Sequence, residues 1–429
     1  MTQTFALHTN GCRLNQYEIE AIGAKLESLG FQQVPFDECA DVSVINTCTV
    51  TARADRDARN AVRRARRRSP DGRIVVTGCY AQAQPEALEA LHEADLILDN
   101  YDKDRLVQHL VEAFGFDLPG AVDWEKLGSE TYALDHFSRH TRAMVKIQDG
   151  CQETCTYCII PRARGHERSR APQAILDEVK NLASAGYKEV VLTGVHVGKY
   201  RWEDWRLVDL LRCILDETDM PQIRVTSMEP REFRPALVDL LVSEPRCCPH
   251  LHIPLQSGND HVLRAMRRSY DTAYVRDLFA RLVARRPDMA IGTDVIAGFP
   301  GETEVMSAST EAFLRSLPVA YLHVFSYSDR PGTVATCLPE KIAPDAIRAR
   351  TSRLRELSRG LRRSFMKRYI GRTVPVLIER RRDRSSGMLI GMSDNYMRVL
   401  ARGPDRFMNR IVAMRIVRLE DELAVAEAA

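Results

Sequence analysis

Three cysteines within eight residues place the strongest constraint on the fold of this chain. Cys151, Cys155 and Cys158 come directly after a predicted β-strand and the pair Asp149-Gly150 that follows it. Three thiolates on one short loop can hold one face of a four-iron cluster and leave the fourth iron without a protein ligand. A zinc site lacking one ligand and three buried cysteines are the alternatives. The position of the loop at a strand end favours the cluster, because ligands of α/β barrels gather there.

A second set of three cysteines recurs in the first hundred residues. Each comes directly after a predicted strand: Cys12 after Thr4–His8, Cys48 after Asp41–Asn46 and Cys79 after Arg73–Thr77. Crossover helices return successive strands in the same direction, so these three loops should meet at one edge of a parallel sheet. Scattered cysteines are more often buried core residues. The repeated strand–cysteine pattern, together with the later cysteine loop, favours a second three-thiolate cluster site.

The rest of the composition narrows the class of protein. The length of 429 residues and the 45% hydrophobic content predict two or three packed domains. No apolar run approaches the roughly 18 residues of a membrane span, and the first residues lack signal-peptide features. We therefore expect a cytoplasmic protein without a membrane segment. Eleven cysteines, an odd number, argue against a disulfide framework. The five others lack such placement: Cys39, Cys213, Cys247, Cys248 and Cys337. Cys213 is most simply a core residue, and burial is favoured over a metal link for Cys247 and Cys248. Cys39 is a rival ligand because it is near Cys48 in the sequence.

Alternating strand and helix patterns predict an α/β chain with an N-terminal domain at 1–115 and a linker at 116–140. The first domain adds a fourth strand at Asp95–Leu98, and helices at Glu18–Leu29, Ala52–Arg68 and Pro85–His92. Residues 141–340 then repeat the rhythm at the spacing of a partial barrel of six βα units. Its expected strands are Ala143–Gln148, Glu189–Thr193, Gln222–Ser227, His250–Pro254, Ala290–Ile296 and Ala320–Ser326. Its expected helices include Pro172–Ala185, Leu207–Asp216, Pro235–Ser243 and Tyr274–Arg285.

The C-terminal part is strongly basic. Residues 341–418 hold 21 Lys and Arg against six Asp and Glu, although the whole chain carries a net charge of only +3. We expect a connecting helix at 341–369, a small antiparallel β-barrel at 370–420 and a tail at 421–429. The expected barrel strands are Val374–Glu379, Tyr396–Ala401 and Ile411–Val417. A basic module on an otherwise acidic chain indicates an anionic partner such as nucleic acid.

The sequence resembles the radical SAM methylthiotransferases over nearly its whole length, where SAM is S-adenosylmethionine. The resemblance rests on blocks around both cysteine sets: Gly11-Cys12-Arg-Leu-Asn15, Asn46-Thr47-Cys48, Gly78-Cys79, and Cys151 to Cys158 running into Ile159-Ile-Pro-Arg-Ala-Arg-Gly165. Later blocks are Leu192-Thr-Gly-Val-His196, Thr226-Ser-Met-Glu-Pro230, His252-Ile-Pro-Leu-Gln-Ser-Gly258 and Thr293-Asp-Val-Ile-Ala-Gly-Phe-Pro-Gly-Glu-Thr303. It implies an N-terminal methylthiotransferase domain, a radical SAM partial (β/α)₆ barrel and a C-terminal barrel of the TRAM kind.

The block His8-Thr-Asn-Gly-Cys-Arg-Leu-Asn15 looks like the branch of this family that acts on threonylcarbamoyladenosine in tRNA. Arg13 fits neither the isopentenyladenosine branch nor the branch that modifies a ribosomal protein aspartate. The resemblance implies insertion of a methylthio group at carbon 2 of this nucleoside at position 37, beside the anticodon. Action on isopentenyladenosine or on the ribosomal aspartate is the alternative. The non-enzyme alternative is an iron–sulfur protein that binds RNA without catalysis.

The resemblance also implies cofactors and partners. It implies two [4Fe–4S] clusters, one on Cys12, Cys48 and Cys79 and one, which also binds SAM, on Cys151, Cys155 and Cys158. SAM is the second cofactor. The partners are tRNA, an electron donor of the flavodoxin or ferredoxin type and a sulfur source, with the protein a monomer. No catalytic side chain is assigned beyond the cluster ligands.

Further residues are candidates for binding SAM or RNA. The SAM candidates are Tyr157, Thr193, Gly194, Ser227, Glu229, Gln256 and Asp294. In radical SAM enzymes the motif that contacts the SAM amine usually ends in Gly-Gly-Glu. The equivalent stretch here is Thr193-Gly194-Val195, so Glu229 is the candidate acidic contact to SAM. Ordinary turn or capping roles are the alternative for these polar groups. The RNA candidates are Arg63, Arg64, Arg67, Arg380, Arg381 and Arg382. A solvated helix face is the alternative for the first three.

Overall fold

The N-terminal residues form a parallel five-stranded sheet in the order β2-β1-β3-β4-β5. The computed structural model describes residues 3–118, 120–128, 134, 137 and 140–429. The strands are β1 Thr4–Thr9, β2 Gln32–Val34, β3 Val42–Thr47, β4 Arg73–Gly78 and β5 Leu96–Ile97. The helices are α1 Arg13–Ser28, α2 Ala52–Arg68, α3 Cys79–Ala83, α4 Pro85–Glu89 and α5 Leu106–Phe114. All four predicted strands are confirmed, whereas the three-residue β2 escaped prediction.

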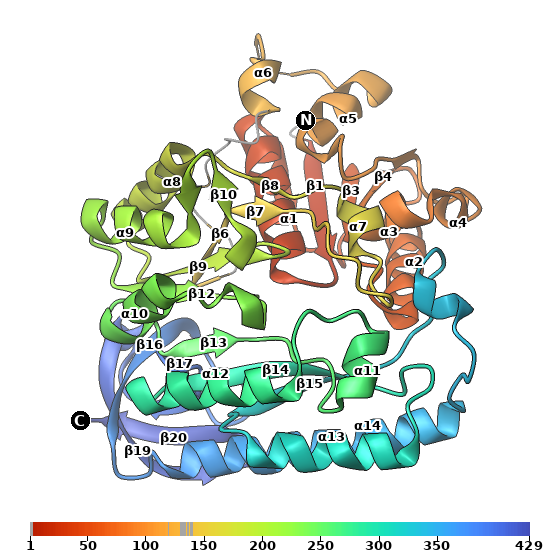
Figure 1. Ribbon diagram of the computed structural model, residues 1–429. Helices are drawn as coiled ribbons and strands as arrows, with labels where there is room; N and C mark the ends of the chain where they lie inside the picture. The colour runs from red at the N-terminus through yellow and green to blue at the C-terminus, as the bar shows by residue number, and fades with distance from the viewer. Residues whose placement is uncertain (1–2, 119, 129–133, 135–136, 138–139) are drawn as a thin grey trace. The chain divides into compact units, whose positions relative to one another are not determined.

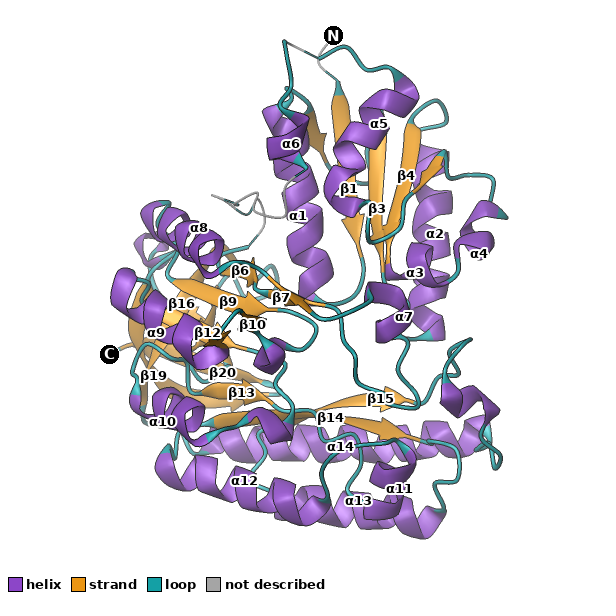
Figure 2. Cartoon of the chain, turned by 45° about the horizontal axis from the view of Figure 1, so that its top comes forward, coloured by secondary structure: helices purple, strands orange, loops and turns teal. Residues whose placement is uncertain are grey.

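Alternating side chains along the strands bury both faces of this sheet. Val42 and Val44 point to one face, where they pack with α1 and α5. Ile45 and Val76 point to the other, where they pack with α2, α3 and α4. The two helical layers on either side of the strands are visible in Figure 2. Apolar residues at successive positions fit a sheet covered on both faces.

The predicted linker at 116–140 is in part attached to this domain. Phe116, Leu118, Val122 and Trp124 pack against the core of α1 and α5. A short helix, α6 Trp124–Leu127, lies within the segment. Residues 119, 129–133, 135–136 and 138–139 of the proposed linker lie outside the described residues.

The cysteine loop belongs with the N-terminal domain. The chain divides into a first unit of Met1–Ser138, Lys146–Glu178 and Ser328–Thr336, and a second unit of the remainder. The predicted boundary at 141 therefore does not describe the compact units. The predicted strand Ala143–Gln148 is also interrupted, into β6 Ala143–Lys146 and β7 Gln148–Asp149. The break arises because β7 pairs instead with the antiparallel β8 Arg168–Ser169. Between them lies α7 Ile160–Arg164.

The second unit contains the strands of the expected partial barrel. They form two three-stranded sheets, β12-β9-β6 and β13-β14-β15. An isolated parallel bridge joins Ile223, in the first of these sheets, to Cys247, three residues before the second sheet begins at His250. The further strands are β9 Glu189–Thr193, β12 Gln222–Val225, β13 His250–His252, β14 Ala290–Ala297 and β15 Tyr321–Ser326, with the small hairpin β10 Arg201–Trp202 and β11 Trp205–Arg206. The helices are α8 Pro172–Ser184, α9 Leu207–Glu217, α10 Pro235–Ser243, α11 Asp260–Ala265, α12 Thr272–Arg285 and α13 Glu304–Ser316.

The C-terminal barrel is closed, in the order β16-β17-β18-β20-β19. It follows α14 Pro344–Lys367, which lies beside α13 (Figure 1). The strands are β16 Thr373–Arg382, β17 Leu389–Ser393, β18 Arg398–Arg402, β19 Ile411–Glu420 and β20 Leu423–Ala428. Two expectations are corrected. The segment 421–429 is not a tail, because burial of Ala424 and Val425 makes it the strand that closes the barrel. The barrel is also not wholly antiparallel, since β18 and β20 are parallel.

The helix at 341–369 is more than a connection. Phe365, Met366 and Tyr369 join one apolar core with the barrel residues Met397 and Val399 and with the strand residues Ala290 and Tyr321. This shared core holds α14, the C-terminal barrel and the last strands of the βα barrel together. Among the described residues, no helix is long and apolar enough to cross a membrane.

Candidate functional site

The three N-terminal cysteines come together at the carboxyl edge of the first sheet. Cys12 precedes α1, Cys48 follows β3 and Cys79 is the first residue of α3. Two glycines permit the close approach. A Cβ on Gly11 would lie 2.6 Å from the Cβ of Cys48, and one on Gly78 would collide with the Thr47 carbonyl. Both glycines have positive φ, at 116° and 103°. The convergence that the strand pattern predicted is therefore present.

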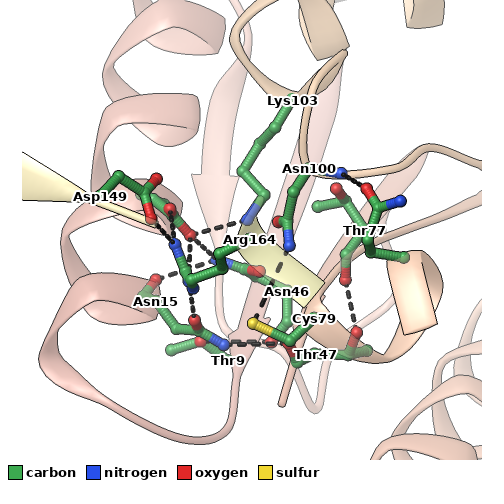
Figure 3. A network of polar contacts seen from close by, with 12 residues as sticks. Thr9, Asn15, Asn46, Thr47, Thr77, Cys79, Asn100, Lys103, Asp149 and Arg164 are labelled. Atoms are coloured by element: carbon green, nitrogen blue, oxygen red, sulfur yellow. Dashed lines mark hydrogen bonds and ion pairs between the residues drawn. The ribbon is translucent and has the colours of Figure 1, made fainter. Parts of the chain in front are cut away.

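Asparagine side chains hold the loops that carry these cysteines. Asn10 accepts a hydrogen bond from the Cys48 backbone N–H at 3.2 Å. Asn15 donates to the Thr47 carbonyl at 3.0 Å, and its Oδ1 lies 3.6 Å from the Cys12 sulfur. The Nδ2 of Asn100 lies 3.9 Å from the Cys79 sulfur (Figure 3). Amide donors toward sulfur are a common way in which proteins tune thiolate-bound clusters.

The donor set at this edge fits a thiolate-bound cluster. Burial raises the pKa of the Cys12 thiol, against the influence of Arg164. Burial and the neighbouring Cys79 raise the pKa of Cys48 to about 12. Thiols whose ionisation is disfavoured, as it is for Cys12 and Cys48, become stable thiolates when a metal centre binds them. Soft sulfur ligands with no carboxylate or imidazole among them match an iron–sulfur cluster better than a hard cation.

A buried arginine joins this edge to the cysteine loop. The Arg164 guanidinium donates to Asp149 at 3.1 Å and to Asn15 at 2.6 Å (Figure 3). It also donates to Glu18 at 2.8 Å. Lys103 donates to the same Glu18 at 2.7 Å. Burial alone would raise the pKa values of Glu18 and Asp149, yet the surrounding cations hold both well below the ordinary range. The two carboxylates are thus ionised, and the network fixes the strand before the cysteine loop.

Sequence reasoning missed this network. Arg164 appeared only as one letter of a motif block, and its partners lie 15 to 149 residues away in the chain. The available signal was the concentration of charged residues among otherwise apolar strand and helix faces, such as Glu18 in α1, which is 7% exposed. A charge on a helix face is usually solvated, so this signal alone does not identify a buried partner.

The Cys151–Cys158 loop has a constrained backbone. Gly150 has a φ of 72°, and a Cβ at that position would collide with the His166 carbonyl. The Cys151 N–H donates to the Gly165 carbonyl at 3.0 Å, and the Glu153 N–H points at the Cys151 sulfur at 3.4 Å. All three cysteines are half-buried, as is Tyr157. Three thiols on a fixed loop match the donors of a cluster with one iron left open.

Both cysteine sets lie in the first unit, and two short helices connect them. Cys79 and Ala83 of α3 pack against Ile159 and Ala163, which directly follow the Cys158 loop. Asn100, the residue beside the Cys79 sulfur, also donates to the Ala163 carbonyl at 2.6 Å. The two predicted cluster sites are therefore connected through the packing of α3 against the residues that follow Cys158.

The other SAM candidates belong to the second unit. Thr193 ends β9 and is buried, with Gly194 directly after it. Ser227 and Gln256 follow β12 and β13 with left-handed backbones, at φ 58° and 73°. Such conformations in residues other than glycine often mark functional sites. The Gln256 backbone forms two hydrogen bonds with the strand β14. Its N–H donates to the Asp294 carbonyl at 2.8 Å, and its carbonyl accepts from the Ile296 N–H at 2.9 Å.

Two of these candidates differ from their expected setting. Burial raises the pKa of Glu229, which is held in an ion pair by Arg268. Asp294 is not at the strand end, because it is the fifth residue of the eight-residue β14. Its Oδ1 lies 2.8 Å from His252 Nε2 and 3.5 Å from His323 Nδ1. These histidines hold the pKa of Asp294 well below its ordinary value, against the effect of burial.

The predicted RNA-binding arginines have different surroundings. Arg63 and Arg67 are exposed on α2, whereas Arg64 is half-buried with its guanidinium 4.8 Å above the Phe36 ring. In β16, Arg380 lies over Tyr187, and Arg381 pairs with Glu379 at 2.9 Å. Arg382 pairs with Asp405 at 2.7 Å and donates to the Gly387 carbonyl at the same distance. Arg67 and Arg380 are the exposed members for which no ion pair is described, while Arg382 is largely engaged within the barrel.

Comparison with known proteins gives two family matches and several relatives that are similar over most of the chain. Residues 4–99 match the uncharacterized protein family UPF0004, and residues 145–312 match the radical SAM superfamily. The chain is 36% identical over 423 residues to the threonylcarbamoyladenosine tRNA methylthiotransferase MtaB of Bacillus subtilis, covering 97% of this chain and 94% of that protein. It is 38% identical to the protein of that name from Aquifex aeolicus, covering 87% and 92%. It is 32% identical to the tRNA-2-methylthio-N(6)-dimethylallyladenosine synthase of Staphylococcus aureus strain MRSA252, covering 96% and 82%.

Solved structures resemble the fold at low sequence identity. The radical SAM methyltransferase TsrM from Kitasatospora setae, solved with cobalamin and a [4Fe–4S] cluster, matches with a TM-score of 0.56 and 17% identity, covering 76% of this chain and 75% of that one. The cobalamin-dependent radical enzyme OxsB matches with a TM-score of 0.51 and 10% identity, covering 86% and 56%. These two structures bear on the fold alone.

Proposed function

Since the chain belongs to the radical SAM methylthiotransferases, we propose that it inserts a methylthio group at carbon 2 of N6-threonylcarbamoyladenosine at position 37 of tRNA. The observation that carries the proposal is the presence of two three-thiol sites in one unit, connected by α3 and α7. A non-catalytic iron–sulfur RNA-binding protein has no need for a second such site beside the SAM-type loop. The 36% identity to the Bacillus subtilis relative, which extends over 94% of that protein, supports threonylcarbamoyladenosine as the nucleoside that is modified.

We assign Cys151, Cys155 and Cys158 to the cluster that binds SAM, and Cys12, Cys48 and Cys79 to a second cluster. When bound, the first cluster supplies the electron for reductive cleavage of SAM, and the second is the site from which sulfur is transferred. The chain's own residues perform binding and positioning. Gly11 and Gly78 bring three strand ends together, and the asparagines fix the thiol-bearing loops. Cys48 and Cys79 are buried at this edge, which limits the access of water to a reactive intermediate.

In the second unit, the left-handed Ser227 and Gln256 present polar groups at strand ends, which supports their assignment to SAM or the adenine base. Thr193, Gly194 and Glu229 are assigned to the same rim, and Tyr157 to the cysteine loop. The reaction further requires a flavodoxin- or ferredoxin-type reductant and a sulfur source. We propose that the protein acts as a monomer, in the cytoplasm where its tRNA substrate is found.

The nucleosides of tRNA test this proposal directly. Mass spectrometry of digested tRNA from a strain lacking the gene should show loss of methylthio-threonylcarbamoyladenosine, with its unthiolated precursor accumulating. Complementation with the intact gene should restore the modified nucleoside. Loss of the methylthio-isopentenyl nucleoside instead would move the enzyme to the other tRNA branch. Unchanged levels of both nucleosides would reject a role in tRNA methylthiolation.

The exposed arginines should contribute to tRNA affinity. We expect Arg67→Ala and Arg381→Ala each to raise the Kd for tRNA about three- to ten-fold, because each removes a charge able to contact phosphate. The dependence of log affinity on log salt should become shallower by about 0.7 to 0.9 per lost phosphate contact. Electrophoretic mobility shifts at several salt concentrations measure both effects. Arg281→Ala is the matched control, since Arg281 is an exposed α12 residue outside the basic stretch 341–418 and is paired with Asp277. An equal effect in the control would indicate general charge attraction and refute specific contacts.

A further inference from the structure

We propose that His252, Asp294 and His323 form a binding site for a divalent transition-metal ion, with no cysteine among its ligands. The His252 Nε2 lies 2.8 Å from Asp294 Oδ1, and His323 Nδ1 lies 3.5 Å from the same oxygen. One ligand atom from each residue falls within 4.8 Å of the other two. No residue of either cysteine set belongs to this group, and Asp294, a SAM candidate in the sequence, is assigned to the metal ion instead of to SAM.

Three neighbouring parallel strands present these side chains. Asp294 of β14 is the register partner of His323 in β15. His252 of β13 is the partner of Gly292, two residues before Asp294 in the same strand. Side chains two residues apart point to one face of a sheet, so all three ligands share that face. Ligands carried by paired strands are held more precisely than ligands on loops.

Gly292 and Tyr321 set the orientation of His252. A Cβ on Gly292 would collide with the Tyr321 ring, so the glycine lets that ring lie across β14. The Tyr321 hydroxyl then lies 2.9 Å from His250 Nε2 and 3.5 Å from His252 Nδ1. When His252 Nε2 binds a metal, its Nδ1 carries the proton and can donate it to the Tyr321 oxygen. An outer partner of this kind is the usual companion of a metal-bound histidine.

The donor set fits zinc or ferrous iron. Two imidazoles and one carboxylate suit these ions, whose bonds to nitrogen and oxygen are about 2.0–2.2 Å. Ligand atoms around a tetrahedral ion of that size stand about 3.4 Å apart, close to the observed 2.8 and 3.5 Å. The His323 side chain is 50% exposed, which gives an ion access. Three protein ligands leave a coordination position for an oxygen donor, such as water or a carboxylate.

Zinc retention by the holoenzyme tests the site. Protein with its iron–sulfur clusters reconstituted is dialysed against buffered zinc, and bound zinc is counted by mass spectrometry separately from iron. We expect about one zinc ion per chain. His323→Ala and Asp294→Asn should weaken zinc binding about 100-fold or more, and Tyr321→Phe about ten-fold through the lost outer partner. The exposed His261, at the start of α11, supplies the control variant His261→Ala, which should bind zinc as wild type does.

Two controls make the outcome decisive. Because bare thiolates also bind zinc, Cys12→Ala is measured in parallel and should retain the zinc ion. His323→Ala removes a half-exposed side chain, so circular dichroism should show an unchanged fold. Equal zinc retention by wild type and His323→Ala would overturn the proposal and leave the three residues as a hydrogen-bonded cluster only. Absence of retained zinc in the wild-type holoenzyme would overturn it as well.

Discussion

Replacing Cys12 by alanine is expected to reduce methylthio transfer to tRNA at least about 1,000-fold while leaving reductive cleavage of SAM within about two-fold of wild type. Cys12 lies with Cys48 and Cys79 at the edge of the first sheet, whereas SAM cleavage is assigned to the loop of Cys151. The iron content after anaerobic reconstitution should fall from about eight to about four atoms per chain. Product tRNA and 5′-deoxyadenosine, quantified in the same reaction, separate the two activities.

The opposite pattern is expected for Cys151→Ala, which should abolish both activities because no SAM is cleaved. Cys39→Ala is the matched control, since Cys39 is an exposed cysteine of the same domain. It should leave iron content and both activities unchanged. Continued thiolation of tRNA by the Cys12 variant would show that the sulfur does not come from this site. Loss of activity in the Cys39 variant would instead make that residue a ligand.

The alternation of strands and helices was predictable because local chemistry marks it. Helix α2 begins and ends where expected: the Thr51 hydroxyl accepts the Ala54 N–H, and three arginines occupy the last turn. The strand β20 was missed because its alanines favour strands weakly, and only barrel closure buries them. Helix α1 begins at Arg13, five residues before its predicted start. The residue before it, Cys12, has an extended backbone and provides no side-chain cap, so the sequence carried no capping signal for this start.

The cysteines of the candidate site were predictable because their strand context repeats along the chain. The polar groups around them were not, since their meaning depends on pairing that only the fold reveals. Asp294 and His323 are 29 residues apart and become neighbours through strand register. Glu18 and Arg164 are 146 residues apart and meet in a buried network. A pattern read along one segment carries no information about such partners.

Replacing the buried Arg164 by methionine should destabilise the first unit by about 3–5 kcal/mol. The guanidinium is 2% exposed and pairs with Glu18 and Asp149, which would both stay buried and each lose one of its cationic partners. Urea denaturation at pH 7 measures the loss, and hydrogen exchange should locate it in α1 and β3. Arg168→Met is the matched control, because Arg168 contacts the same Asp149 at 3.1 Å but is 32% exposed. We expect the control to cost less than about 1 kcal/mol.

The effect of Arg164→Met should also depend on pH in a definite direction. The pKa values of Glu18 and Asp149 are lowered in the folded chain, so their ion pairs stabilise it above the unfolded pKa values of about 4 and are lost as the pH falls. The stability difference between wild type and variant should therefore be largest near neutral pH and shrink in acid. A difference that stays constant from pH 7 down to about pH 2 would mean that Arg164 acts through packing of its side chain. A difference that grows in acid would contradict the ionised state of both carboxylates.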